Sequence, residues 1–364
     1  MATFSLIFGT ALVSAVLLTP LVRRLAMAAG VVDRPDAARK LHARPVPLLG
    51  GLAVYAATVL GLLAAVYLGL LPAAHIKEKY LVGLALAGAL LVFGGSWDDA
   101  RNLKPWRQFL WPVLAALAVI ASGIGVDYVT NPFGGLLHLD EVVLPVLTWQ
   151  GVPYKLTVLA DLFTLVWLLG MTYTTKFLDG LDGLVAGVTG IGALILAAVS
   201  LMREVAQPDT ALLALALAGA CFGFLVFNFH PARIFLGEGG STLCGFLLGV
   251  LAIVSGGKIA TALLVMGLPI FDAALVIIGR LRRGRTPFGG DRTHLHFRLL
   301  DVGFTQRQVV LIYYFAAALF GVSTLVLRGW EKVVALGFSA SLLFAAGAFT
   351  LALTRRKAPK IEKI

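Results

Sequence analysis

The chain is a succession of long apolar runs separated by short polar segments. Runs of about 18–22 residues recur along its length, and each could cross a hydrocarbon layer of roughly 30 Å as a helix. The first run, from Thr3 to Val22, is too long for a signal-peptide core, and no small-residue cleavage pattern follows it. The other predicted spans begin near Leu48, Tyr80, Gln108, Leu156, Leu184, Thr210, Ser241, Ile259, Gln308 and Val333. The pattern predicts an all-α polytopic membrane protein with about 11 transmembrane helices.

The conspicuous polar residues gather in five of the connecting segments. These are 33–51, 94–108, 176–183, 228–241 and 280–307. No internal repeat, low-complexity stretch or soluble domain interrupts the spans, so we expect a single membrane-embedded domain over 1–364. The long connection on the opposite side, 126–155, alternates β-branched and turn residues in a pattern that is typical of a hairpin.

Composition and charge support this picture and give it an orientation. Hydrophobic residues make up 59% of the chain and charged residues 13%, with a mean hydropathy of +0.91. A soluble domain could not bury that much apolar surface. Placing the Arg23–Pro47 loop inside puts most of the 30 Lys and Arg residues inside. The positive-inside rule then predicts an external N-terminus and a cytoplasmic C-terminus. The chain has a net charge of +11, and its concentration on that face favours anionic partners at a membrane, not nucleic acid.

Two pairs of aspartates stand at the ends of predicted spans. Asp98 and Asp99 are adjacent where the third span meets the cytoplasm, and adjacent carboxylates there are costly unless a proton or cation offsets them. Asp179 and Asp182 occur in Asp-Gly-Leu-Asp-Gly, where the glycines permit close approach of a phosphate or metal. A solvated helix end would also explain the first pair, and a simple turn the second.

Two further segments contain candidate functional residues, one with an acidic side chain and one with mainly basic side chains. Gly237–Ser241 begins a span, and its free N–H groups and helix dipole could cradle an anion, with Glu238 as a cation ligand. Close helix packing would also explain the glycines, but not the acid. In 280–307, some arginines serve topology alone, whereas His294 and His296 between Arg292 and Arg298 fit a group that grips phosphate.

These segments together contain what metal-assisted phosphoryl transfer requires. Carboxylates and a basic, phosphate-gripping loop are expected on the same side of the membrane. A secondary transporter is the alternative from another class, but transporters place functional charges near the midplane between repeats. The two cysteines, Cys221 and Cys244, have no companion residues at metal spacing, so we interpret them as buried packing residues.

The motifs and their order resemble those of the polyprenyl-phosphate N-acetylhexosamine-1-phosphate transferase family. The matching pieces cover nearly the whole chain: Asp33 through Gly51, Asp98-Asp99 with Leu103 and Pro105, Asp179 through Leu184, Asn228 through Gly240, Pro269 through Asp272, and Asp291 through Leu299. The first motif and the His-Leu-His loop are closer to the branch that uses UDP-N-acetylglucosamine than to the peptidoglycan branch.

The resemblance implies that a polyprenyl (undecaprenyl) phosphate attacks the β-phosphorus of a UDP-sugar, giving a polyprenyl-diphospho-sugar and UMP. It implies Mg²⁺, with Mn²⁺ as an alternative, and the first membrane step of a cell-envelope polysaccharide such as lipopolysaccharide or teichoic acid. The location implied is the bacterial inner membrane with a cytoplasmic active site; a homodimer stays open.

The resemblance also implies roles for individual residues. Asp98 and Asp99 would handle the lipid phosphate, and Asp179 and Asp182 would line the metal and nucleotide site. Glu238 would bind the metal, and His294 and His296 would contact phosphate or close the loop. The remaining residues would bind substrate, with Asn228 and Phe235 at the uracil: Lys40, His42, Arg44, Asn228, Phe235, Arg292 and Arg298.

The chain departs from the family pattern at four places. Lys176 stands where the family has a metal-site Asn, and Glu238 replaces an Asp. Phe297 replaces a third His, and the polar residues after Asp-Asp are shifted, with Arg107 and Gln108 nearby. Our hypothesis is that the Lys176 ammonium pairs with Glu238 and takes over part of the cation's role, since a protonated lysine cannot ligate metal. The departures also leave open a family member that binds polyprenyl phosphate without turnover.

Overall fold

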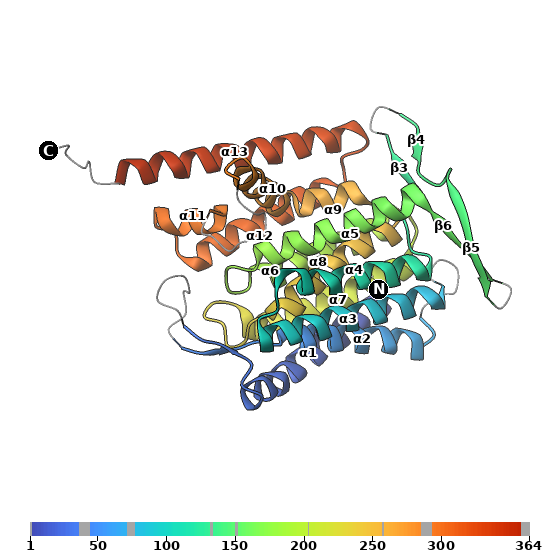
Figure 1. Ribbon diagram of the computed structural model, residues 1–364, viewed down its shortest axis with the longest axis horizontal. Helices are drawn as coiled ribbons and strands as arrows, with labels where there is room; N and C mark the ends of the chain where they lie inside the picture. The colour runs from blue at the N-terminus through green and yellow to red at the C-terminus, as the bar shows by residue number, and fades with distance from the viewer. Residues whose placement is uncertain are drawn as a thin grey trace.

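The computed structural model describes residues 2–35, 44–70, 77–131, 134–149, 152–202, 204–256, 258–284 and 293–357. Three of the predicted binding residues, Lys40, His42 and Arg292, lie outside these ranges. Helices dominate, and Figure 1 shows most of them lying side by side along the long axis of the molecule. The long apolar helices confirm a mostly helical, multi-pass membrane protein.

The helices follow the predicted order along the chain. They are α1 (Ala2–Ala28), α2 (Gly50–Tyr67), α3 (Glu78–Arg101), α4 (Pro105–Ser122), α5 (Val158–Leu178), α6 (Leu184–Ser200), α7 (Pro208–Asn228), α8 (Gly237–Val254), α9 (Ile259–Val265), α10 (Gly267–Leu281), α11 (Leu295–Val302), α12 (Gln306–Ser323) and α13 (Trp330–Lys357). Each predicted span start lies close to the start of one of these helices. The amphipathic helix α11 is an addition that the apolar pattern did not predict.

Not every predicted span is long and apolar enough to be assigned as a membrane crossing. Among the described residues, 7 helices meet that requirement, or up to 8 if α9 and α10, bent by 78° at Met266, form one broken span. The helix α6 is a shorter apolar helix. In Figure 1, α1 begins toward the end with the β-hairpins and α13 ends toward the opposite end. The predicted count and the inside–outside orientation stay predictions.

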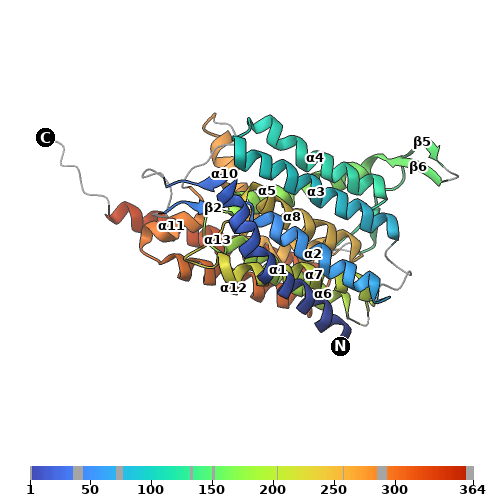
Figure 2. The same ribbon diagram turned by 90° about the horizontal axis from the view of Figure 1, so that it is seen from below.

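The core of the bundle is organised around α8. In the apolar stretch of α8, 89% of residues are buried, against 17% for α13, so α8 is central and α13 peripheral. Figure 2 shows α8 in the middle of the bundle, with α3 and α5 on one side and α2 and α7 on the other. The helix α8 packs against each of these four helices. A polar first turn on this helix is therefore held by protein on several sides.

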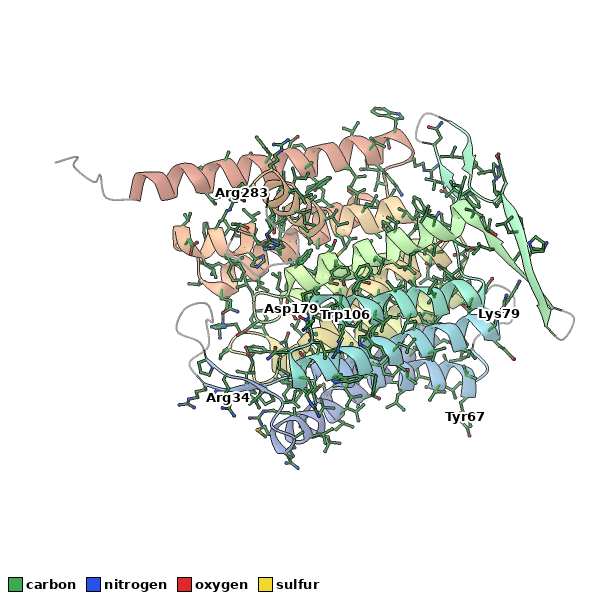
Figure 3. All side chains as sticks on the ribbon, in the orientation of Figure 1. Arg34, Tyr67, Lys79, Trp106, Asp179 and Arg283 are labelled. Atoms are coloured by element: carbon green, nitrogen blue, oxygen red, sulfur yellow. The ribbon has the colours of Figure 1, made fainter. Side chains whose placement is uncertain are left out.

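In the part of the chain that the structure describes, six short strands form three antiparallel pairs outside the helical bundle. Strand β1 (Val32–Asp33) pairs with β2 (Val46–Pro47), β3 (Tyr128–Thr130) with β4 (Leu136–His138), and β5 (Val143–Trp149) with β6 (Val152–Thr157). The hairpin predicted for 126–155 is therefore confirmed, as two hairpins. Tyr128 lies opposite His138, and Val143 lies opposite Thr157. Figure 1 shows these two hairpins at one end of the bundle, and Figure 3 places Tyr67 and Lys79 toward that end and Arg34 toward the other.

Candidate active site

Asp98 links the end of α3 to the beginning of α4. Its Oδ1 accepts hydrogen bonds from the N–H of Leu103 at 2.6 Å and from Nε2 of Gln108 at 3.1 Å. The helix ends at Asn102, whose φ of 47° turns the chain toward α4. Asp98 is buried, and its carboxylate both positions this turn and fixes the Gln108 amide. Burying a carboxylate at the end of a span costs free energy, and the two neutral N–H donors of Leu103 and Gln108 offset part of this cost for Asp98.

The amide of Gln108 connects Asp98 to an ion pair. Its Oε1 accepts a hydrogen bond from Lys176 Nζ at 2.8 Å. The same ammonium lies 2.9 Å from Oε2 of Glu238, in the first turn of α8. The chain Asp98–Gln108–Lys176–Glu238 therefore joins three of the predicted polar segments, and the Lys176–Glu238 pair predicted from the sequence is present.

Asp99 occupies the N-terminus of α8. Its Oδ1 accepts the N–H of Glu238 at 3.0 Å, so a carboxylate from α3 satisfies a free N–H group at the positive end of the helix. Its Oδ2 is buried against Gly237, where a Cβ would come within 2.3 Å. Gly237 also has a φ of 71°, which favours glycine. One N–H of the predicted anion cradle is thus taken up by a side chain of the protein itself.

The glycines at the start of α8 allow two other helices to approach its backbone. A Cβ on Gly95 of α3 would lie 2.1 Å from the nitrogen of Gly239, and one on Gly51 of α2 would lie 2.3 Å from that of Gly240. The first predicted motif is tied to the same region, because Gly51 N–H donates to the carbonyl of Leu236 at 2.8 Å. These glycines therefore allow the backbones of α2 and α3 to pack closely against the first turn of α8, which is the alternative role that the sequence left open.

Asp182 and Asn228 hold the loop that precedes α8. Asp182 Oδ2 lies 2.7 Å from Nδ1 of His230 and accepts the N–H of Ala232 at 3.0 Å. The buried Asn228 amide donates to the carbonyl of Ile234 at 2.9 Å and accepts the N–H of Gly183 at 3.1 Å. These bonds give both residues a positioning role. The predicted contacts of Asn228 with uracil and of Asp182 with a metal stay predictions.

Asp179 caps the C-terminus of α5. The residue is partly accessible at the surface, whereas its carboxyl group is largely shielded from solvent and lies close to two other carboxylates. Desolvation is the main cause that raises its pKa, to about 8, and the charges of Glu238 and Asp182 add to the effect. Figure 3 shows Asp179 where the neighbouring helices end. The raised pKa marks a surplus of negative charge at this point of the site.

The two predicted histidines have different surroundings. His294 Nδ1 lies 2.9 Å from Oδ2 of Asp272, and the N–H of Leu295 donates to the other oxygen of that carboxylate at 2.8 Å. The ring of His294 stacks on Phe177 at 6.1 Å between centroids. Since Phe177 follows Lys176 in α5, the basic loop is brought beside the carboxylate network.

His296 does not have the properties predicted for a phosphate-gripping residue. Its side chain is fully buried, and neither ring nitrogen has a hydrogen-bond partner. Burial is the main cause that lowers its pKa, to about 3, so the ring is neutral at physiological pH. It packs between His294 and Phe297, with centroid distances of 5.4 and 4.3 Å. A neutral, buried ring agrees better with closing the loop than with contacting phosphate, and both predicted roles of His296 stay predictions.

A pocket opens beside the network. Its lining combines the polar side chains of the network with apolar and aromatic groups: Leu91, Gly94, Gly95, Asp98, Gln108, Trp111, Pro112, Tyr173, Lys176, Glu238 and Thr242. Trp111 contacts Phe93 and Trp97 with centroid distances of 5.3 and 6.1 Å. Phe93 and Trp97 are exposed on α3. The pocket lining therefore combines charged side chains with aromatic rings.

The other predicted binding residues are placed less centrally. Phe235 is half-buried in the loop before α8, and its backbone bonds to Pro47 and Gly50. Arg44 is exposed. The guanidinium of Arg298 lies against Gly347 of α13. The structure thus brings together Asp98, Asp99, Asp179, Glu238 and His294, and it does not bring Arg298 to them through a hydrogen bond or ion pair.

The predicted Mg²⁺ or Mn²⁺ does not fit the donor set around Glu238. Within the described ranges, no group of three His, Cys, Asp or Glu side chains could hold a metal ion. One oxygen of Glu238 pairs with an ammonium, and Oδ1 of Asp99 accepts an N–H of the α8 backbone, which leaves only Oδ2 of Asp99 without a hydrogen-bond partner. Hard divalent ions require several oxygen ligands at one point, which these contacts do not supply. The metal stays a prediction.

Three residues of the site were not predicted as site residues. Gln108 bridges Asp98 and Lys176, Asp272 holds His294, and His230 binds Asp182. Asp272 carried a usable signal, because an acid within an apolar helix needs a partner. For Gln108 and His230 the sequence showed only that they lie in polar segments, and this does not identify the residues to which they bind.

Known proteins resemble this chain over most of its length. Residues 81–256 match the model of the family described as glycosyl transferase family 4. A Bacillus subtilis protein named probable undecaprenyl-phosphate N-acetylglucosaminyl 1-phosphate transferase is 30% identical over 328 residues, which cover 88% of this chain and 84% of that protein. A Mycolicibacterium smegmatis protein named decaprenyl-phosphate N-acetylglucosaminephosphotransferase is 32% identical, with 90% and 79% covered. An Escherichia coli protein named undecaprenyl-phosphate alpha-N-acetylglucosaminyl 1-phosphate transferase is 30% identical, with 85% and 81% covered.

Proposed function

The chain belongs to glycosyl transferase family 4, and from this premise we propose that it transfers N-acetylglucosamine-1-phosphate from UDP-N-acetylglucosamine to a polyprenyl phosphate. An oxygen of the lipid phosphate forms a bond to the β-phosphorus of the donor. The bond between that phosphorus and the bridging oxygen breaks, and UMP leaves with the electron pair. The product is a polyprenyl-diphospho-sugar.

One observation carries the proposal at the level of the site. Side chains from three separate polar segments join in a single network, Asp98–Gln108–Lys176–Glu238, in the wall of one pocket. His294 and Asp179 lie beside that network through α5. Phosphoryl transfer is catalysed mainly by positioning and by fixed charges that offset developing charge. A rigid network of alternating charge is suited to that task.

The pocket also accounts for a lipid acceptor. A polyprenyl phosphate carries an anionic head on an apolar tail, and the pocket is lined by both charged groups and aromatic rings. A phosphate monoester has a second pKa of about 6, so it is largely doubly ionised at neutral pH. The acceptor therefore needs orientation and charge neutralisation more than a strong base, which agrees with an Asp98 that is already held by hydrogen bonds.

The relatives support a location as well. The Bacillus subtilis, Mycolicibacterium smegmatis and Escherichia coli relatives are bacterial proteins, and UDP-sugars are cytoplasmic metabolites, so we propose that the pocket faces the cytoplasm at a bacterial inner membrane. The excess of Lys and Arg in the same segments favours this orientation. The reaction would then begin the assembly of a cell-envelope polysaccharide. The predicted metal has no place in this proposal, because Glu238 is paired with Lys176.

The test is release of UMP by purified protein in detergent from UDP-N-acetylglucosamine and undecaprenyl phosphate. We expect UMP and lipid-linked sugar in equal amounts, and no UMP when undecaprenol without phosphate replaces the acceptor. Asp98→Asn should lower turnover by about 100-fold if its charge and hydrogen bonds organise the site. Asp140→Asn, on the exposed hairpin loop, is the matched control. Donor cleavage that is independent of the lipid phosphate would contradict the proposal.

A further inference from the structure

The ammonium of Lys176 holds the central position in the carboxylate network. It donates to Gln108 Oε1 at 2.8 Å and pairs with Glu238 Oε2 at 2.9 Å. It also lies 5.8 Å from the centre of the Tyr173 ring. An ammonium has three N–H donors, so two oxygen partners leave a third for another acceptor. Lys176 lines the pocket, which is where that acceptor would come from.

The charges around Lys176 are unbalanced without it. Asp99, Asp179 and Glu238 lie close enough for their charges to affect one another. Of the ion pairs in the described part of the chain, only the Lys176 pair reaches this group. His230 pairs with Asp182, which is outside this group of three. A positive charge therefore already lies against Glu238, the carboxylate whose charge acts on both Asp99 and Asp179.

A divalent ion at Glu238 would compete with that ammonium. The cation would have to displace or approach a positive group that is 2.9 Å from its intended ligand, at a site where like charges repel strongly. Moving Lys176 away would also break its bond to Gln108 and thereby disturb Asp98. The geometry favours a built-in cation over an exchangeable one.

We infer that the Lys176 ammonium is the resident cation of this site: it supplies the positive charge that a protein-bound divalent ion would supply, and its free N–H binds a phosphate oxygen of the substrates. The inference rests on the proposed function and names a further catalytic residue for it. Gln108 and Glu238 act as positioning residues, because they hold the ammonium toward the pocket. An ammonium binds phosphate as a compact charge.

The first experiment measures divalent binding without substrate. Mn²⁺ binding to the full-length protein is followed by electron paramagnetic resonance for the wild type, Lys176→Asn, and Lys176→Asn combined with Glu238→Asp. We expect the wild type to bind Mn²⁺ at least about tenfold more weakly than the double variant, since removing a neighbouring charge exposes the acids. Lys77→Asn, at the opposite end of α3, controls for loss of a lysine. Equal, stoichiometric binding by wild type and double variant would overturn the inference.

The second experiment measures UMP release in EDTA. Wild type should retain its turnover, Lys176→Met should lose at least about 100-fold, and Lys176→Arg should keep a measurable part through its retained charge. Full loss of wild-type turnover in EDTA, restored by Mg²⁺, would overturn the inference. If no variant releases UMP under any condition, the proposed function fails, whereas the Mn²⁺ comparison still decides whether Lys176 excludes a divalent ion. Thermal unfolding of Lys176→Met and Lys176→Arg separates misfolding from lost chemistry.

Discussion

The imidazole Nδ1 of His294 lies 2.9 Å from Oδ2 of Asp272, and this buried pair fastens the start of α11 to α10. The second oxygen of Asp272 accepts the N–H of Leu295, so one carboxylate holds both the ring and the first turn of the helix. A carboxylate that accepts from Nδ1 leaves the other ring nitrogen as the group available to a ligand. Asp272 thereby fixes both the position and the proton of His294.

Replacing Asp272 by Asn should destabilise this attachment. An amide can accept only one of the two hydrogen bonds, so a buried donor loses its partner at a cost of about 1–3 kcal/mol. We expect a lower apparent melting temperature in detergent and reduced UMP release. Asp140→Asn is the control, because it removes an exposed His–Asp pair of 3.4 Å whose contribution should be below about 1 kcal/mol. Equal effects of the two substitutions would show that burial of the Asp272 pair is unimportant.

Gly95→Ala should disrupt the junction of α3 and α8. Its Cβ would lie 2.1 Å from the backbone nitrogen of Gly239, and backbone atoms in the first turn of a central helix cannot move aside cheaply. We expect loss of several kcal/mol of stability, of order 3 kcal/mol or more, visible as low yield of folded protein by fluorescence-detected gel filtration. Gly170→Ala in α5 has nothing within 4 Å of the new Cβ and should be neutral or slightly stabilising.

The ionisation of Asp179 should give the stability of the protein a distinctive dependence on pH. Its folded-state pKa of about 8 lies above the unfolded value, so folding takes up a proton between these two values. The stability that the protonated group contributes is therefore lost as pH rises through the folded pKa. Asp179→Asn cannot titrate, so the melting temperature of the wild type should fall more than that of the variant between pH 5 and about 8. If the melting temperatures of the two proteins changed in parallel with pH, the raised pKa of Asp179 would be contradicted.

The positions of the helices were predictable from the sequence, but the partners within the site were largely not. Apolar length is a local property, so the predicted span starts lie near observed helices, including the broken pair at Met266. The Lys176–Glu238 pair was predictable because two unusual residues had complementary charge. Gln108 was not, since a neutral amide can bridge many partners. The bend between α9 and α10 and the burial of His296 depend on neighbours that are distant in the sequence.

His296 and His294 should respond in opposite ways to replacement by leucine. The ring of His296 is buried without a hydrogen-bond partner, and it is packed among aromatic rings. An apolar side chain of similar size avoids an unsatisfied polar group, so His296→Leu should leave the apparent melting temperature unchanged or raise it, and UMP release should persist. His294→Leu strands the Asp272 carboxylate and should lower the melting temperature by the equivalent of about 1–3 kcal/mol. Loss of turnover in a folded His296→Leu protein, with its melting temperature intact, would instead assign this ring a direct role in binding phosphate, as the sequence predicts.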